Sequence, residues 1–363
     1  MKKAVIIGAG HSGCWAAYEL AKEGFDVDVY EEDRKPGMHA VLICTYSLCD
    51  YLGFVPRSMN RVSRAVLFSK NSGAELEFDR KRPDLIIDRM EFTKLLEKKA
   101  RAAGARFHYS SRFLGFSKNK RITVNLKDGN KTRKIETDVL IGADGTLSRV
   151  AKAAGLHSNK KLIEISQAVV SLKEKVDREA MQIWFYPQLT NYFFWLIPID
   201  STKVAIGTMA AKNSMKILKD FLKRFKIEKV TEWQHTLAPS YEKGKISSDS
   251  VFLVGDAAGK MKVTTVGGIV SGLRSAKALS KAIISKRSYN RELCGLDSEL
   301  QLHAIARKIL DKFNDNDYDN LLEMMDYKVK RLFYGHTRDE LSKMALKLAL
   351  AQPKFLLFAK KLF

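Results

Sequence analysis

Three glycines follow a short apolar run near the start of the chain, and an acid follows them. Gly8, Gly10 and Gly13 form the pattern G-x-G-x-x-G, and Glu31 lies 21 residues beyond the second glycine. Gly8 permits a tight turn, Gly10 lets the backbone approach a pyrophosphate, and Gly13 lets a helix pack closely on a strand. The N-terminus of that helix attracts phosphate charge, and an acid at this distance accepts hydrogen bonds from a ribose diol. The pattern predicts a site for an ADP-containing dinucleotide.

These residues require a strand, a helix and a second strand to position them, and the sequence has that order. Residues 4–7 are continuously apolar, as a buried parallel strand requires, and residues 27–30 form the second strand. Between them, one face of the expected helix carries small and apolar side chains, namely Ala16, Ala17, Leu20 and Ala21. A glycine turn without a ligand is the weaker interpretation in this context.

Three later segments bear on which dinucleotide binds. The segment PDLIIDRMEF predicts a strand, then Asp88 and Arg89, then a helix, and the segment TDVLIGADG predicts a strand that runs into Gly142, Asp144 and Gly145. A third strand leads into the stretch GDAAGKMKVTTVGGI, residues 255–269, whose one carboxylate is Asp256. Small residues at a turn indicate that a ligand or another backbone comes very close. We therefore expect Gly255 and its small neighbours to make room for the cofactor.

The set of segments resembles the FAD-dependent oxidoreductases of the glutathione-reductase type, in the branch with aromatic hydroxylases and geranylgeranyl reductases. The resemblance implies that Arg89, Asp144, Gly145 and Asp256 bind FAD. It also implies a helix whose N-terminal N–H groups point at the flavin and stabilise negative charge on its reduced form. That helix begins at Gly267, Gly268 and Ile269.

Within this branch the chain resembles the geranylgeranyl reductase family in three places. The segment VLICTYSLC implies that Cys44 and Thr45 lie at the site. FFWLIP is similar to the family's Y-x-W-x-F-P signature, which implies substrate contacts for Phe193, Trp195 and Pro198. The third place is residues 255–269, which follow the pattern G-D-A-A-G-x-x-x-P-x-T-G-x-G-I.

Two valines depart from this last pattern. Val263 stands where the family has proline, and Val266 stands where it has glycine. Because a β-branched residue disfavours positive φ, we expect the loop to differ locally from the family's.

The resemblance implies a reductase that saturates C=C bonds of geranylgeranyl chains, with archaeal-type membrane phospholipids as the expected substrates. Hydride from reduced flavin reaches one carbon of the alkene and a proton reaches the other. The aromatic face of Trp195 would stabilise positive charge at the more substituted carbon. Cys44 is a candidate for shaping or protonating the site, and a small buried hydrophobe is an equal alternative.

Two other functions stay open. FFWLIP also approaches the halogenase pattern W-x-W-x-I-P, so a flavin-dependent monooxygenase or halogenase is one alternative. A non-catalytic flavin-binding protein at a membrane surface is the other, and only the altered loop at Val263 and Val266 favours it.

The expected fold is α/β, with a discontinuous Rossmann-like FAD-binding domain over residues 1–58, 80–155 and 247–290. An antiparallel β-sheet substrate domain is expected over residues 59–79 and 156–246, and a C-terminal helical segment over residues 291–363. Residues 339–363 predict a basic amphipathic segment, with Leu341, Met344, Ala345 and Leu348 on one face.

Composition limits the partners and the compartment. The net charge of +22 favours an anionic membrane surface, and without a recognisable nucleic-acid motif we expect no nucleic-acid partner. Four cysteines without a C-x-x-C pair predict neither a metal site nor a disulfide framework. No window has the length and apolarity of a transmembrane helix. We expect a cytoplasmic, peripheral membrane protein, with NAD(P)H or a ferredoxin-like protein as electron donor.

Overall fold

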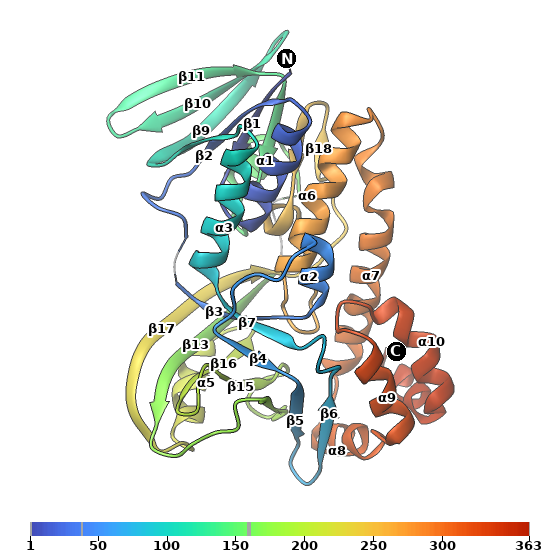
Figure 1. Cartoon of the computed structure of the whole chain (residues 1–363). Coiled ribbons are helices and arrows are strands. Elements are labelled where there is room, and N and C mark those ends of the chain that lie inside the picture. Colours follow the sequence, from blue (N-terminus) through green and yellow to red (C-terminus); the bar gives the residue numbers. More distant parts are fainter. Residues whose placement is uncertain (1, 38, 158–160, 363) are drawn as a thin grey trace. The chain divides into compact units, whose positions relative to one another are not determined.

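The computed structural model describes residues 2–37, 39–157 and 161–362, which form two compact units (Figure 1). Unit 1 comprises Met1–His39, Arg89–Lys161 and Pro239–Leu300, and unit 2 comprises Ala40–Asp88, Leu162–Ala238 and Gln301–Phe363. Both units are discontinuous in sequence, so each site assembled within a unit draws on distant segments.

Unit 1 contains a six-stranded sheet in the order β18-β19-β12-β1-β2-β8. Its strands are β1 (Lys3–Ile7), β2 (Asp26–Tyr30), β8 (Arg106–His108), β12 (Val139–Gly142), β18 (Ser247–Ser248) and β19 (Val251–Leu253). All neighbours pair in parallel except β18 and β19. The apolar run of β1 is buried, as a central parallel strand requires.

Helices α1 (His11–Lys22), α3 (Arg89–Ala102) and α6 (Ile269–Ile284) lie side by side in unit 1, with α1 packed against both others (Figure 1). Unit 1 also holds a three-stranded antiparallel sheet, which the sequence did not reveal. Its strands are β9 (Ser111–Lys118), β10 (Ile122–Asp128) and β11 (Lys131–Thr137). Two short helices follow β12 and β19, namely α4 (Arg149–Ala153) and the 3₁₀ turn η1 (Gly255–Ala258).

Unit 2 is built on a seven-stranded sheet in the order β17-β13-β16-β15-β14-β5-β6. Its strands are β5 (Arg64–Phe68), β6 (Gly73–Glu77), β13 (Leu162–Leu172), β14 (Ala180–Trp184), β15 (Phe194–Pro198), β16 (Lys203–Ala210) and β17 (Ile227–Pro239). A second sheet, β3-β7-β4, contains β3 (Val41–Cys44), β4 (Asn60–Val62) and β7 (Asp84–Asp88). Helices α2 (Ser47–Leu52) and α5 (Ser214–Leu222) complete this part.

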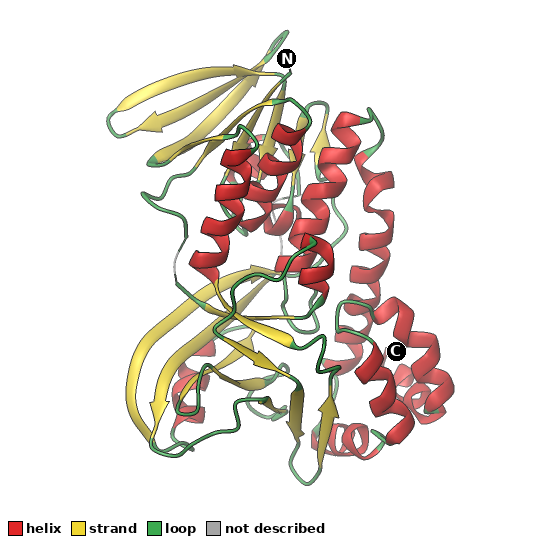
Figure 2. Ribbon diagram, viewed as in Figure 1, coloured by secondary structure: helices red, strands yellow, loops and turns green. Residues whose placement is uncertain are grey.

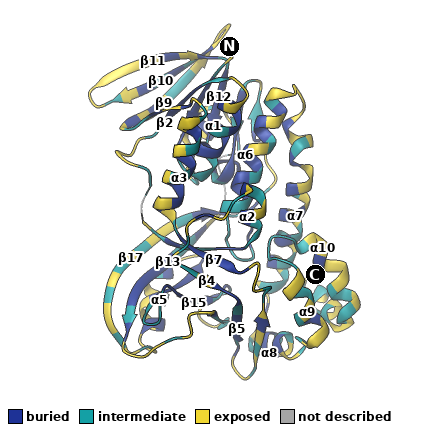
Figure 3. Cartoon of the chain, viewed as in Figure 1, coloured by how far each residue is buried: buried dark blue, intermediate teal, exposed yellow. Residues whose placement is uncertain are grey.

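The C-terminal part of the chain is helical (Figure 2). Its elements are α7 (Tyr289–Leu310), α8 (Asp315–Glu323), α9 (Tyr327–Gly335), α10 (Leu341–Ala351) and the 3₁₀ segment η2 (Pro353–Leu362). The exposed faces of these last helices contrast with the buried central strands of both units (Figure 3).

The predicted fold class is confirmed: a Rossmann-like α/β unit, a β-sheet unit and a helical C-terminal segment are all present. In the seven-stranded sheet β14 pairs with β5 in parallel, whereas β13–β16, β16–β15, β15–β14 and β5–β6 are antiparallel pairs. The boundaries of the two compact units differ from the predicted domain boundaries. Residues 40–58 and 80–88 fall in unit 2, because β3 and β7 pair with each other and not with the six-stranded sheet.

Candidate cofactor and substrate sites

The glycines of the loop after β1 differ in what surrounds them: protein atoms crowd the Cβ positions of Gly8 and Gly13 but not that of Gly10. Gly8 has φ +103°, and a Cβ there would meet the Ala143 carbonyl oxygen at 2.3 Å. A Cβ on Gly13 would lie 2.0 Å from the Gly8 carbonyl oxygen. Gly10, the N-cap of α1, has φ −71°, and no protein atom lies within 4 Å of its Cβ position. The protein's own packing therefore needs Gly8 and Gly13, whereas the space beside Gly10 at a helix N-terminus fits an approaching pyrophosphate.

Glu31 is held at the edge of this loop. Its backbone N–H donates to the His108 carbonyl at 2.9 Å, and its carboxylate accepts from the Ala9 N–H at 2.7 Å and the Asp33 N–H at 3.1 Å. Both carboxylate oxygens are thus fixed near the loop, where a ribose acceptor is needed.

His11, which the sequence analysis did not select, is the first residue of α1. Its ring lies 5.2 Å from the ring of Phe92. Burial and the nearby charge of Arg89 lower the pKa of His11 to about 3, so the imidazole is neutral at physiological pH. A neutral ring leaves the positive end of the helix as the main local attraction for phosphate.

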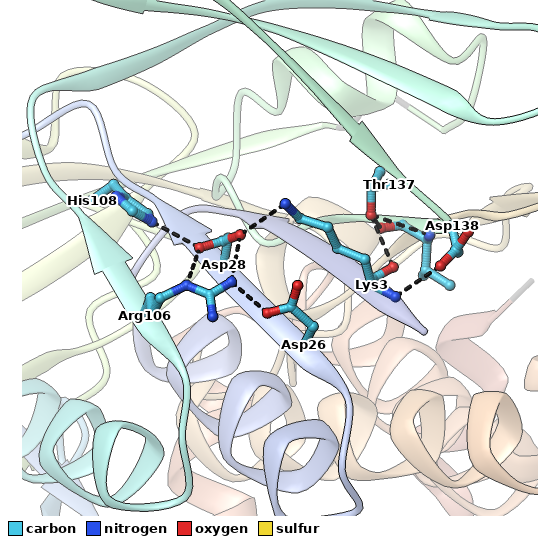
Figure 4. Close-up of polar contacts among 8 residues, drawn as sticks. Lys3, Asp26, Asp28, Arg106, His108, Thr137 and Asp138 are labelled. Atoms are coloured by element: carbon cyan, nitrogen blue, oxygen red, sulfur yellow. Dashed lines mark hydrogen bonds and ion pairs between the residues drawn. The ribbon is translucent and has the colours of Figure 1, made fainter. Parts of the chain in front are cut away.

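A charged cluster fixes the strand that ends at Glu31 (Figure 4). The buried carboxylate of Asp28 accepts from Arg106 Nε and Nη2, both at 2.9 Å, and lies 2.8 Å from His108 Nε2 and 3.3 Å from Lys3 Nζ. Arg106 also pairs with Asp26. The cluster ties β1, β2 and β8 together at their side chains, and His108 stacks on Tyr30 next to Glu31.

Ser12 links the first glycine loop to the turn after β19. A Cβ on Gly255 would lie 2.3 Å from Ser12 Oγ, and one on Gly272 would lie 2.5 Å from the same atom. We expected Gly255 to be small because of the cofactor. The structure gives a different reason, since the Ser12 hydroxyl occupies the space. The sequence shows Gly255 before Asp256 and Gly272 within α6, but no known spacing pattern links these two glycines to Ser12.

Asp256, Gly267 and Gly268 gather at the N-terminus of α6. Gly268 is its N-cap, and a Cβ there would lie 3.1 Å from Asp256 Oδ1. Lys262 is buried, forms a β-bridge with Gly267, and has its side-chain end beside that glycine. Ile269 is the first residue of α6, so the predicted helix start is where the sequence put it.

Val266 corrects the expectation about this loop. It has φ +49°, the left-handed conformation that the family's glycine would adopt freely. The loop therefore does not avoid positive φ. It imposes positive φ on a β-branched residue, at a cost of about 1–3 kcal/mol.

Val266→Gly is expected to stabilise the protein by about 1 kcal/mol, because relief of strain exceeds the entropy that glycine adds to the unfolded chain. FAD content should stay stoichiometric, and thermal unfolding with flavin quantification measures both. Thr265→Gly is the matched control, since Thr265 has no positive φ to relieve and should destabilise. Loss of flavin from Val266→Gly would mean that the valine side chain supports the site by packing.

Asp144 and Gly145 lie at the turn after β12. The Asp144 carboxylate accepts from Ser148 Oγ at 2.5 Å and from the Val150 N–H at 3.0 Å, and its burial raises the pKa. Gly145 has φ +76°. Asp144 thus organises the start of α4, and its contact with FAD stays a prediction. Arg89, at the start of α3, is exposed.

In unit 2, Trp195 lies across a glycine of the neighbouring strand. Its indole N–H donates to Gln167 Oε1 at 2.8 Å, and Gln167 Nε2 donates to the Val41 carbonyl and to Gln234 Oε1. A Cβ on Gly207 would lie 2.3 Å from Trp195 Cζ2. The ring's edge and one side are therefore fixed by the sheet.

Trp195 belongs to a group of partly buried apolar side chains that pack against one core cluster of unit 2. The Phe193 ring meets it edge-on at 6.1 Å, and Pro198 ends the same strand, buried. Other partly buried apolar residues pack against the same core cluster, namely Ile43, Ile183, Phe185, Met325 and Phe333. Cys44, at the end of β3, is buried, and the Thr45 hydroxyl donates to Asp339. The structure thus provides an aromatic surface in the unit that carries Cys44.

Known proteins match both the fold and the sequence. The family model described as an FAD binding domain matches residues 1–298. The chain belongs to this family of FAD-binding proteins. Its cofactor is FAD, as predicted, and the protein is an FAD-dependent oxidoreductase.

Relatives narrow the resemblance. The chain is 26% identical to digeranylgeranylglycerophospholipid reductase of Methanocaldococcus jannaschii, over 88% of this chain and 90% of the relative. It is 24% identical to the protein of that name in Methanococcus vannielii, over 99% and 97%. The fold matches that of a geranylgeranyl bacteriochlorophyll reductase-like protein from Thermoplasma acidophilum over all of both chains, with TM-score 0.82 and 18% identity. The flavin-dependent halogenase CmlS shares the fold with TM-score 0.69 and 17% identity, over 99% of this chain and 78% of the halogenase. The predicted resemblance to the geranylgeranyl reductases is confirmed.

Proposed function

We propose that this protein reduces C=C bonds of geranylgeranyl chains on archaeal-type membrane phospholipids. The observation that carries the proposal is the fixed aromatic surface around Trp195, in a chain whose other unit has an FAD-type glycine loop. The names of the two relatives support the same substrate class.

An isolated alkene has no carbonyl oxygen on which negative charge can develop, so an oxyanion hole has nothing to stabilise. Bound FAD supplies the two-electron reducing equivalent. The chain's contribution is to exclude water, to hold the alkene against an electron-rich ring, and to provide the proton. Trp195 suits the second task, because an indole face attracts positive charge. Cys44 is the proposed proton donor or shaping residue of unit 2.

The test uses purified FAD-loaded protein, reduced anaerobically with dithionite so that no natural donor is assumed. Digeranylgeranylglycerophospholipid should gain about 2 Da per double bond, and D₂O should label the carbon that takes the proton. A mass gain of one oxygen that requires air would establish a monooxygenase instead. No change in any prenyl lipid under either regime would leave a non-catalytic flavin protein.

Trp195→Ala should slow turnover on the order of tenfold and leave FAD content unchanged, because a cation–π contact is worth about 1 to 2 kcal/mol at a desolvated site. Single-turnover reduction of the lipid and flavin absorbance measure the two quantities. Trp184→Ala is the control, since Trp184 stacks on Phe68, meets Phe221 edge-on, and packs against a different core cluster from Trp195. Equal loss of turnover in both variants would assign the effect to sheet packing.

We also propose that the C-terminal segment contacts an anionic membrane surface. Over the residues that the structure describes, no helix is long and apolar enough to span a bilayer. Within the segment Met344 is buried, whereas Leu346, Leu350, Leu356 and Leu357 are exposed. Lys347 and Lys354 are exposed on the same segment. Leucines with interspersed lysines suit a headgroup interface.

Lys347→Gln with Lys354→Gln should weaken binding to anionic vesicles about thirtyfold, because each lysine near such a surface contributes about 1 kcal/mol. Vesicle co-sedimentation at two salt concentrations measures the change. Lys131→Gln with Lys134→Gln removes the same charge from exposed positions of β11 and should have little effect. Equal weakening in both pairs would mean that net charge alone attracts the vesicles.

A further inference from the structure

The turn between α9 and α10, residues 336–340, contacts the segment that follows β3. The Thr45 hydroxyl donates to Asp339 Oδ2, and Ser47 Oγ lies 2.6 Å from Thr337 Oγ1. The two segments thus run in opposite directions, with Thr45 beside Asp339 and Ser47 beside Thr337. The two segments are 290 or more positions apart in sequence, so only the fold brings them together.

Arg338, between these two partners, binds the neighbouring strand. Its Nη1 lies 2.5 Å from Asp84 Oδ2 at the start of β7, and the next residue, Leu85, pairs with Cys44. The Asp84 side chain is 6% exposed, and a carboxylate this buried needs a partner charge. Burial acts to lower the pKa of Arg338, but the carboxylate of Asp84, which also accepts its hydrogen bond, and the carboxylate of Asp339 raise it. Arg338 therefore ties the turn to the strand whose second residue pairs with Cys44.

The turn is internally fixed, so it presents these groups in one arrangement. The Thr337 N–H donates to Glu340 Oε2 at 3.2 Å, and the Glu340 N–H donates to the Thr337 carbonyl at 3.1 Å. Lys343, one turn into α10, pairs with the other Glu340 oxygen at 2.6 Å.

We propose that Arg338 and Asp339 are positioning residues for the Cys44–Thr45 segment, which makes the C-terminal helical segment part of the site. The role in turnover rests on the proposed function. The physical reason is that β3 has only four residues and ends at Cys44, so the following backbone needs outside support to hold the thiol in place. The paired hydroxyl–carboxylate and guanidinium–carboxylate contacts provide it from one rigid turn.

The first test measures alkylation of Cys44 by N-ethylmaleimide in FAD-loaded protein, with the modified peptide quantified by mass spectrometry. A buried thiol reacts through local opening, so loss of a hydrogen bond to a charged group should raise the rate about tenfold. Asp339→Asn and Thr45→Val remove opposite partners of the same hydrogen bond, so both should show this rise. Agreement between the two variants would argue against a folding defect peculiar to one of them. Arg338→Gln should do the same, and Arg338→Lys should restore most of the protection. Arg64→Gln, which breaks ion pairs to Glu75 and Asp177 elsewhere in unit 2, should leave the rate unchanged.

The second test is turnover of the prenyl lipid by the same variants. Asp339→Asn should lower kcat about tenfold, with KM within about twofold and FAD content unchanged. The reason is that Asp339 holds the Cys44–Thr45 segment in position and is not proposed to bind the lipid or FAD. Unchanged alkylation rates, or faster alkylation with unchanged kcat, would overturn the proposal. If wild-type protein turns over no prenyl lipid, the proposed function fails, and the alkylation rates alone decide whether the turn holds Cys44.

Discussion

Purified Gly10→Val protein is expected to be folded and colourless. No protein atom lies within 4 Å of the Gly10 Cβ position, and its φ of −71° is one that valine adopts, so the chain itself accommodates the side chain. A pyrophosphate that approaches the α1 N-terminus would meet the valine methyl groups. The FAD dissociation constant should rise at least about hundredfold, which corresponds to the ~3 kcal/mol upper range of overpacking costs.

Flavin absorbance per protein and thermal unfolding of the flavin-free protein together test this expectation. Gly13→Ala provides the contrast, because its Cβ would lie 2.0 Å from the Gly8 carbonyl oxygen and should reduce stability as well as flavin content. Gly10→Ala should fall between Gly10→Val and wild type in affinity. Stoichiometric FAD in Gly10→Val would show that the pyrophosphate does not pass this glycine.

The second large effect is expected for Asp28→Asn, which leaves Arg106, Lys3 and His108 without their shared carboxylate. The expected loss is about 2 kcal/mol, a value discounted because Arg106 and Lys3 are partly solvent-exposed. The melting temperature of flavin-free protein at pH 7 should fall by about 3 °C. FAD affinity should also weaken, because the strand that ends at Glu31 loses its side-chain ties.

The pH dependence gives an independent check on Asp28. Although burial acts to raise it, the hydrogen bonds from Arg106 and His108 hold the pKa of Asp28 well below its usual range. A depressed pKa contributes stability that is complete above the unfolded-state value, near 4, and declines as the pH falls below it. The stability difference between wild type and Asp28→Asn should therefore narrow below about pH 4. Asp249→Asn, at the exposed ion pair with Lys118, should change stability little at any pH. A constant difference from pH 7 to pH 3 would mean that Asp28 acts through packing alone.

The cofactor loop was predictable because its determinants are local. Gly8, Gly10, Gly13 and Glu31 are set by one strand–helix–strand unit, and each has a separate physical requirement. The strands around Trp195 were predictable for the same reason, since apolar and aromatic runs bounded by turns favour strands.

The remaining features depend on contacts between distant segments. Nothing near Thr45 indicates that its hydroxyl pairs with Asp339, and nothing near Ser12 indicates Gly255. The two acids of β2, Asp26 and Asp28, were a readable signal, since charged residues on one face of a central parallel strand need partners. The register between β2 and β8 determines which cationic side chains pair with these two carboxylates. Val266 went against expectation because propensity is a weak guide where tertiary packing fixes the backbone.

The contact between Trp195 and Gly207 has an evolutionary consequence. Gly207 does not have a positive φ, so it is required for space and not for backbone conformation. An added methyl group there would overlap the indole ring and would lie 2.7 Å from the Ser166 carbonyl oxygen, and a smaller ring at position 195 would relieve the first of these two contacts. The two positions should therefore change together during divergence, with alanine at 207 tolerated only beside a smaller residue at 195. In a double-mutant cycle, Gly207→Ala should be more costly in the presence of Trp195 than in the Trp195→Ala background, where only the approach to the Ser166 carbonyl oxygen remains. In homologues that act on other substrates, a residue larger than glycine at position 207 would then follow a smaller ring at position 195 and not precede it, which sets the order in which the two positions can diversify.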